Sequence, residues 1–230
     1  MSRYKNYRLV HEESKTDSEL IKLLHEAAVR YKRYLNQNLI FIFHESAKSP
    51  VYDYYEVYFG KENFIHLAGF ARGDISASEF FDKCLSGSIL LKEVRFSENR
   101  KSASAKLGVL SGLLDYRHTK IYRIGNADLI TLKNRFELAV GHGNGLIGFD
   151  QRSSAGLPVP VTVLNRSITD FVSTPQILVV VLSKSRGEKY YTRIIGCPNS
   201  GFPIAVLPKG IRKKISPDLT DNLYLQEKSD

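Results

Sequence analysis

The chain has 230 residues, of which 43% are hydrophobic and 25% charged, and it carries a formal net charge of +9 with a pI near 9.4. This composition argues against a disordered polymer, and the longest apolar run, 177–182, is far shorter than the roughly 20 residues of a membrane-spanning helix. The two cysteines form no CxxC pair, and no apolar leader is present. We therefore expect a cytoplasmic protein without a disulfide framework.

The ends of the chain differ in composition from its middle. Residues 1–16 and 219–230 are polar and charged, and we expect both segments to be flexible. Residues 17–218 carry the apolar patterning, which predicts one α+β domain: N-terminal helices packed on a C-terminal antiparallel β-sheet.

Two capping boxes mark helix starts. Thr16 is followed by Glu19, and this pattern predicts a helix that runs to about Leu35. Ser76 and Glu79 repeat the pattern at the start of a shorter helix. Its buried residues are expected to be Phe80, Phe81, Cys84 and Leu85.

A third helix is predicted over residues 100–114. Lys106 stands three and four residues from Val109 and Leu110 and seven from Leu113, so it lies on or beside the apolar stripe of this helix. The stripe itself consists of Ala103, Leu107, Leu110 and Leu114.

Strands dominate the second half of the chain. Apolar or alternating runs are separated there by Gly, Pro, Asn or Asp, which is typical of an antiparallel sheet. Including two earlier runs, the predicted strands are 38–44, 51–59, 135–140, 145–149, 159–164, 176–183 and 190–195. In the run 51–59, Val51, Tyr55, Val57 and Phe59 are expected on the buried side.

The stretch KENFIHLAGF places His66 among apolar residues. Such a histidine is either a hydrogen-bonded core residue or the proton carrier of an active site. In the second case its apolar neighbours would hold it rigidly, and partial burial would keep it neutral near pH 7.

GHGNG, at residues 141–145, lies between two predicted strands. Asn-Gly in this position is typical of a tight hairpin, in which both central residues take positive φ. We interpret His142 as a solvated turn residue, although a hairpin tip can also present a histidine to a groove.

The remaining histidines, His11, His25, His44 and His118, do not pair at metal-ligand spacing, and no HExxH or acidic triplet is present. We therefore expect neither a metal nor a cofactor.

Positive charge is concentrated in two segments. Residues 92–123 hold eight Lys or Arg against three acids, and residues 184–214 hold eight against one. Such clustering predicts a polyanionic partner, with an inert basic surface as the other interpretation. The cations expected to contact substrate phosphates are Arg72, Lys101, Arg123, Arg152, Lys184 and Arg186.

A family resemblance adds to this reading. Over residues 38–196 the chain resembles the phage-associated BECR-type nucleases (barnase, EndoU, colicin and RelE-like), specifically their fourth family. The resemblance is carried by NFIHLAG, FFDKC, KLGVL, LIGFD, PVPVTVLN, ILVVVLSK and KYYTRIIG.

The resemblance implies N-terminal helices followed by an antiparallel sheet, and a metal-independent endoribonuclease. The Asn-Phe-x-His-Leu motif of the family falls on Asn63, Phe64, His66 and Leu67. Its helix lysine falls on Lys106, and its proline with a following small hydroxyl residue falls on Pro160 and Thr162, where Thr replaces the commoner Ser. His66, Lys106 and Thr162 are the catalytic residues that the resemblance implies.

Two hypotheses follow. The first is a toxin-like or phage-associated endoribonuclease acting on RNA, including tRNA, and controlled by a neutralising protein. The second is a non-enzymatic protein that binds RNA or a host factor through residues 184–214, with Tyr52, Tyr54 and Tyr58 stacking on bases. Neither hypothesis specifies the oligomeric state.

Overall fold

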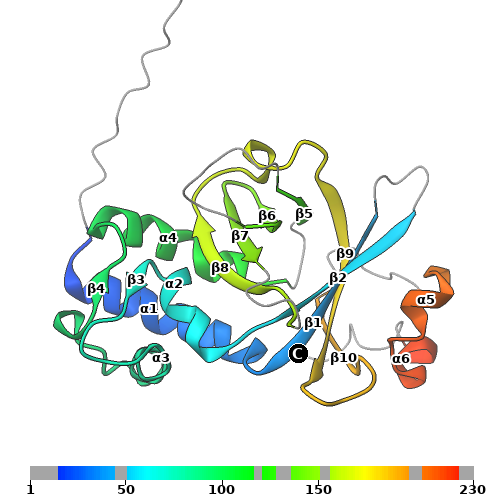
Figure 1. Cartoon of the computed structure of the whole chain (residues 1–230), viewed down its shortest axis with the longest axis horizontal. Coiled ribbons are helices and arrows are strands. Elements are labelled where there is room, and N and C mark those ends of the chain that lie inside the picture. Colours follow the sequence, from blue (N-terminus) through cyan, green and yellow to red (C-terminus); the bar gives the residue numbers. More distant parts are fainter. Residues whose placement is uncertain are drawn as a thin grey trace, which may run out of the picture.

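The computed structural model describes residues 15–44, 51–116, 121–127, 136–150, 156–196 and 204–222. The fold is α+β, as predicted: helices in the N-terminal half pack on a large antiparallel sheet (Figure 1). Most of the two ends that we expected to be flexible lies outside these residues.

The first helix, α1 (Asp17–Tyr31), begins with the predicted capping box. The Glu19 backbone N–H donates to Thr16 Oγ1 at 3.3 Å, and the Thr16 N–H donates to Glu19 Oε2 at 2.7 Å. A 3₁₀ turn, η1 (Lys32–Tyr34), extends the helix almost to the predicted end.

The second capping box is only half formed. Ser76 Oγ accepts a hydrogen bond from the Glu79 N–H at 3.1 Å and starts α3 (Ala77–Ser86). The Glu79 carboxylate instead lies 3.7 Å from Lys83 Nζ. The predicted third helix is present as α4 (Arg100–Leu113), with Asn99 as its N-cap.

Eight strands form the main sheet in the order β2-β1-β9-β5-β6-β7-β8, with β10 paired to β9. The strands are β1 (Gln37–His44), β2 (Tyr52–Tyr58), β5 (Arg123–Asn126), β6 (Leu138–His142), β7 (Gly145–Asp150), β8 (Val159–Leu164), β9 (Gln176–Ser185) and β10 (Arg193–Gly196). The sequence did not predict β5. Val51, expected on the buried side, precedes β2 and is 65% exposed.

Shorter elements connect β2 to the helices. The chain leaves β2 through η2 (Lys61–Asn63) and α2 (Phe64–Leu67) and enters the two-residue strand β3 (Phe70–Ala71). This strand pairs with β4 (Arg95–Phe96), which follows η3 (Leu91–Glu93) and precedes α4.

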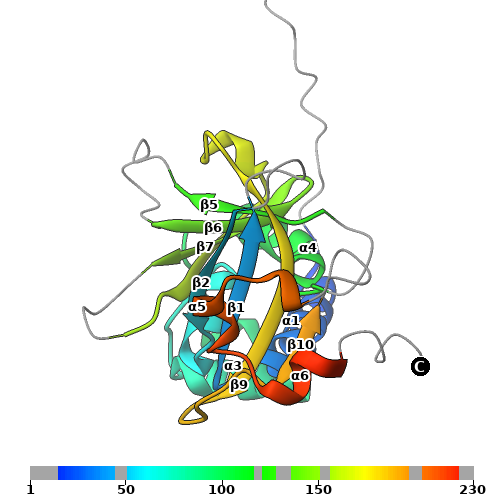
Figure 2. The same cartoon turned by 90° about the vertical axis from the view of Figure 1, so that its right-hand side faces the viewer.

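The two faces of the sheet are covered differently (Figures 1 and 2). On the inner face, α1 to α4 bury the main core, which includes Leu24, Phe81 and Leu107 against Phe41 and Val57. On the outer face lies the C-terminal segment, residues 204–222, with η5 (Ile204–Val206), α5 (Lys209–Arg212) and α6 (Pro217–Asn222).

The C-terminal segment packs on the outer face through apolar side chains. Ile204, Leu207, Ile211, Ile215 and Leu219 contact a layer formed by Ile40, Ile42, Val179, Val180 and Leu182. Leu219 is therefore buried, whereas the sequence predicted a flexible tail from this residue onward. Across the described ranges, no helix is both long and apolar enough to cross a membrane.

A third, smaller cluster covers the outer side of β6 to β8. Phe136 and the segment around η4 (Ile168–Asp170) pack there against alternate residues of the strands. Its buried members are Phe136, Ala139, Leu146, Ile168, Phe171 and Val172.

Candidate active site

His66 lies in the short helix α2, which is fixed from both sides. Asn63 Oδ1 accepts a hydrogen bond from the Gly60 N–H at 3.1 Å and closes the turn before the helix. Phe64, Ile65 and Leu67 are buried, while His66 itself is only half-buried. His66 is therefore the least buried of these residues of α2, held between buried apolar neighbours.

The turn after α2 brings the chain against α4. Gly69 has φ +84°, a conformation that favours glycine, and its N–H donates to the His66 carbonyl at 3.2 Å. A Cβ on Gly69 would lie 2.9 Å from Ala103 Cα and 3.2 Å from Lys106 Cδ. The Lys106 side chain therefore lies against Gly69, and Gly69 follows His66 by three residues.

Lys106 is a desolvated cation. It is half-buried, and burial lowers the pKa of Lys106, an effect that the Glu98 carboxylate only partly offsets. Within the described part of the chain, no carboxylate approaches Lys106 to ion-pair distance. Partial burial removes part of the hydration of a cation, and a cation in such a position favours an anionic partner.

Three elements predicted to carry the catalytic residues meet. α2, α4 and the edge strand β8 all pack against one another, and Figure 1 shows α2 and α4 next to β8. His66 and Lys106 are thus brought to one region of the inner face.

Thr162 is placed differently. It is buried and lies directly opposite Gly148 in β7, and the position of a Cβ on Gly148 is filled by the Phe136 ring. Because directly paired residues of an antiparallel ladder project to the same face, the Thr162 side chain faces the Phe136 cluster, while Val163 faces the core beneath the helices. By this register Thr162 and Val163 project to opposite sides of β8, the strand on which α2 and α4 pack.

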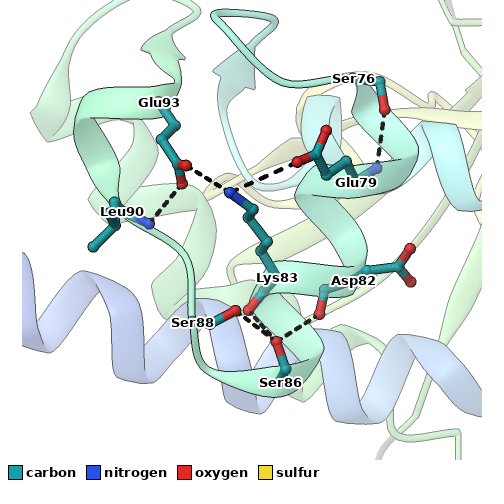
Figure 3. Close-up of polar contacts among 8 residues, drawn as sticks. All are labelled: Ser76, Glu79, Asp82, Lys83, Ser86, Ser88, Leu90 and Glu93. Atoms are coloured by element: carbon teal, nitrogen blue, oxygen red, sulfur yellow. Dashed lines mark hydrogen bonds and ion pairs between the residues drawn. The ribbon is translucent and has the colours of Figure 1, made fainter.

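A polar network around Lys83 joins α3 to η3 (Figure 3). Lys83 Nζ lies 2.5 Å from Glu93 Oε1, and Glu93 Oε2 accepts a hydrogen bond from the Leu90 N–H at 3.2 Å. These bonds fix η3 immediately before β4, and the Ser97 N–H beyond β4 donates to the Gly69 carbonyl at 3.0 Å. The hydrogen bond with Glu93 raises the pKa of Lys83 and, reciprocally, lowers the pKa of Glu93.

The cations expected to bind phosphate are dispersed. Arg72 and Lys101 are exposed and lie on the segments that flank the Gly69 turn and begin α4. Arg123 is exposed on β5, and Lys184 and Arg186 lie at the turn between β9 and β10. Arg152 lies outside the described residues.

His142 is not a solvated turn residue, which corrects the prediction from sequence. It is half-buried at the end of β6, its Nε2–H donates to the Gly112 carbonyl at 3.2 Å, and its ring contacts Tyr122 edge-on at 4.6 Å. Tyr122 Oη also donates to the Gly112 carbonyl, at 2.9 Å. His142 and Tyr122 thus satisfy a terminal carbonyl of α4.

The GHGNG hairpin itself is present. His142 pairs with Gly145, so the two central residues are Gly143 and Asn144. Only Gly143 has positive φ, at +54°, which is the pattern of a type II′ turn rather than the expected type I′.

The other histidines form no site. His25 Nδ1–H donates to the Cys84 carbonyl at 3.1 Å, and the buried His44 contacts Tyr52 edge-on. His11 and His118 lie outside the described residues. Where the structure describes the chain, no three His, Cys, Asp or Glu side chains gather as metal ligands would.

The sequence did not predict one polar cluster. On the outer face, Glu56 Oε2 lies 2.7 Å from Lys214 Nζ, and Tyr191 Oη donates to Glu56 Oε1 at 2.8 Å. The two-residue alternation of β2, which puts Glu56 on the same face as Tyr54 and Tyr58, was the available signal. Its partner Lys214 is distant in sequence and carries no such signal.

Comparison with known proteins identifies the family. Residues 23–195 match the family model described as phage-Barnase-EndoU-ColicinE5/D-RelE like nuclease4. Comparisons with curated proteins and with solved structures gave no significant match. The match covers the elements from α1 to β10, including α2, α4 and β8. The chain therefore belongs to this family of phage-associated BECR-type nucleases.

Proposed function

We propose that the protein is a metal-independent endoribonuclease whose reaction depends on His66 and Lys106. The observation that carries the proposal is the desolvated Lys106 ammonium lying on the Gly69 turn, three residues after the half-buried His66, in a chain of nuclease ancestry. A bound phosphate would supply the anion that Lys106 lacks in the described structure.

The chemistry follows from the two groups. His66 takes the proton of a ribose 2′-OH, and the oxygen attacks the adjacent phosphorus. The bond from phosphorus to the 5′-oxygen breaks, and the leaving oxygen takes up a proton. Lys106 stabilises the negative charge that develops on the phosphoryl oxygens. The products are a 2′,3′-cyclic phosphate and a 5′-hydroxyl.

The division of roles has a physical basis. An unperturbed imidazole titrates near pH 6.5, so it is available as a base at neutral pH. A lysine ammonium is a compact point charge, and in a water-poor site its interaction with a phosphate is stronger than in bulk water.

The test is RNA cleavage in EDTA. End-labelled total RNA and tRNA are incubated with the wild type, with His66→Ala and with His25→Ala, a control that removes a histidine bound to the Cys84 carbonyl and no group of the candidate site. We expect fragments with 2′,3′-cyclic phosphate ends from the wild type and His25→Ala, and a loss of about 10²–10⁴-fold for His66→Ala, the usual worth of general base catalysis. Undiminished cleavage by a folded His66→Ala would contradict the role of His66.

One observation supports the second hypothesis, which is a non-enzymatic basic protein that binds RNA or a host factor. Cations lie over tyrosine rings on the outer face, for example Lys184 Nζ at 4.7 Å from the Tyr191 centroid. Absence of turnover, with salt-dependent retention of RNA by both the wild type and His66→Ala, would support this function instead.

A further inference from the structure

One end of the outer face carries aromatic and basic side chains together. The ladder register places Tyr58 of β2 opposite Asn38 of β1, and Asn38 opposite Lys184 of β9. The Arg186 guanidinium lies over the Tyr58 ring, 5.8 Å from its centroid. We refer to Tyr58, Lys184 and Arg186 as the tyrosine–cation platform.

The platform lies beyond the rows that the C-terminal segment covers. That segment packs on Ile40, Ile42 and Leu182, in the middle of the outer face. Tyr58 and Lys184, one row further along, remain half-buried, and Arg186 is exposed. A ligand can therefore reach the platform without displacing the C-terminal segment.

The cations of the platform contact neutral groups of the protein: Lys184 Nζ lies 4.7 Å from the Tyr191 ring centroid and 3.5 Å from the Lys189 carbonyl oxygen, and Arg186 lies over Tyr58. Glu56, the nearest carboxylate on this face in the ladder, is held by Lys214 at 2.7 Å. Glu188 is engaged within the turn, where its Oε2 accepts a hydrogen bond from the Ser185 N–H at 2.7 Å. In the residues for which the structure gives side chains, neither Lys184 nor Arg186 has a carboxylate at ion-pair distance.

The end of β2 connects the platform, on the outer face, to the segment that carries His66. The Tyr58 N–H donates to the Pro158 carbonyl at 2.9 Å, directly before β8, the strand on which α2 packs. His66 follows Tyr58 by eight residues. Since a fully extended chain spans at most about 3.6 Å per residue, the two Cα atoms are less than about 29 Å apart.

We infer that the tyrosine–cation platform binds single-stranded RNA, an inference that rests on the proposed nuclease function. A tyrosine ring offers a stacking surface to an unpaired base, and the neighbouring cations neutralise the phosphates on either side. A duplex hides its base faces inside the stack, so it gains only the electrostatic part.

Binding is tested apart from cleavage by using a labelled single-stranded oligonucleotide with 2′-O-methyl riboses, which lacks the attacking hydroxyl. Fluorescence anisotropy gives the affinity of the full chain and of four variants. Tyr58→Leu and Arg186→Ala remove the stacking ring and the guanidinium. Tyr58→Phe keeps the ring, and Lys22→Ala removes one positive charge from the exposed side of α1.

We expect Tyr58→Leu to weaken binding by about tenfold or more, the usual loss for one stacked base. Arg186→Ala should weaken binding and reduce the slope of log K against log salt by about 0.7, the value for one single-strand phosphate contact. Tyr58→Phe and Lys22→Ala should bind within about twofold of the wild type, since the ring and the local charge are intact.

Three results would overturn the inference: wild-type affinity of a folded Tyr58→Leu and Arg186→Ala, equal affinity for a duplex of the same sequence, or equally effective competition by an acidic peptide of matched charge. Thermal unfolding of each variant shows whether it is folded. If the wild type never cleaves RNA but the platform variants lose affinity, the nuclease proposal is wrong and RNA binding by the platform is supported. If the wild type cleaves RNA and the variants bind with wild-type affinity, only the inference about the platform is wrong.

Discussion

Two lysines on opposite faces of the sheet differ in the direction of their pKa shifts and in whether a carboxylate pairs with them. Lys106, on the inner side, is half-buried, its pKa is lowered by burial, and no carboxylate in the described chain lies within ion-pair distance. For Lys214, on the outer side, burial is the largest single cause and acts to lower the pKa, but the hydrogen bonds and charges of Glu56 and Tyr54 together outweigh it, and the pKa of Lys214 is raised.

The two lysines differ in their counter-charge. Lys214 has an ion-pair partner, and Lys106 has none among the described residues. The Lys214 ammonium is compensated in the folded state, so it stabilises the packing of the C-terminal segment. The Lys106 ammonium has no ion-pair partner among the described residues and is only partly offset by Glu98, and under the proposed function a bound phosphate supplies the counter-charge. Net charge along the sequence does not show this distinction, since the most basic segment, residues 184–214, contains the compensated lysine.

Among the variants that test this comparison of lysines, the largest expected effect is that of Lys106→Met. Cleavage should fall by about 10²–10³-fold, the usual cost of removing one electrostatic contact to the transition state. Thermal stability should rise, by about 2 °C, because an unpaired cation leaves a half-buried position and about 1 kcal/mol corresponds to 2–4 °C in a chain of this size. A variant that cuts RNA normally and unfolds at a lower temperature would make Lys106 an ordinary structural residue.

Gly69→Ala tests the turn that joins His66 to Lys106. The new Cβ would lie 2.9 Å from Ala103 Cα at a residue with φ +84°, so we expect a loss of about 2–3 kcal/mol and reduced cleavage. Gly87→Ala is the matched control, because Gly87 has φ +72° and a Cβ there would approach only His25 Nδ1, at 3.9 Å. Its loss should be about 1 kcal/mol with normal cleavage. Equal losses in chemical denaturation would show that α4 does not constrain the turn.

Lys214→Met breaks the outer-face pair. It leaves the Glu56 carboxylate, which is 20% exposed, without its ammonium partner, and we expect a loss of about 1–2 kcal/mol of unfolding free energy with cleavage retained. Urea denaturation of the wild type and the variant measures the difference. No loss of stability would mean that apolar contacts alone hold the C-terminal segment.

The same pair predicts a pH window. Burial acts to raise the pKa of Glu56, but the bonds from Lys214 and Tyr191 outweigh it and leave the pKa lowered. The stability from Glu56 is therefore present above its unfolded pKa of about 4.3 and lost as pH falls through the lower folded value. The stability from Lys214 is present below about 10.4 and lost as pH rises through the higher folded value. The difference between the wild type and Lys214→Met should be constant from about pH 5 to 10 and shrink at both extremes.

The smallest effect is expected for Gly108→Ala. Gly108 is exposed within α4, and a Cβ there meets no atom within 4 Å. Alanine should stabilise the helix by about 0.5–1 kcal/mol, without changing cleavage, because it loses less backbone entropy than glycine. Altered cleavage in a normally folded variant would place the exposed side of α4 within the site as well.

Local signals predicted much of the fold. The Thr16–Glu19 capping box gave the start of α1, and the apolar spacing around Lys106 gave α4 to within one residue. The strand bounds 159–164 agree with those of β8. The family resemblance was confirmed by the match over residues 23–195.

What the sequence could not predict depends on distant partners. β5 has four residues, including Gly125 and Asn126, and exists because β6 and β9 flank it. His142 is bound by a carbonyl of α4, which no local pattern indicates. The short helices α5 and α6 lack a long periodic stripe and are held by the outer face.

The candidate site was predictable only in part. The resemblance identified His66 and Lys106, and the structure brings the elements that carry them together. The face of Thr162 depends on a ladder irregularity between Gly148 and Phe149, where the pairing with β8 shifts by one residue. Such a bulge changes which side chains share a face, and the sequence of β8 alone does not show it.

The most direct test of the central claim is mass spectrometry of the 3′ ends produced from tRNA in EDTA by the wild type and by His66→Ala. The account predicts 2′,3′-cyclic phosphate ends from the wild type and none above background from the variant. Equal amounts of the same ends from a folded His66→Ala would contradict it.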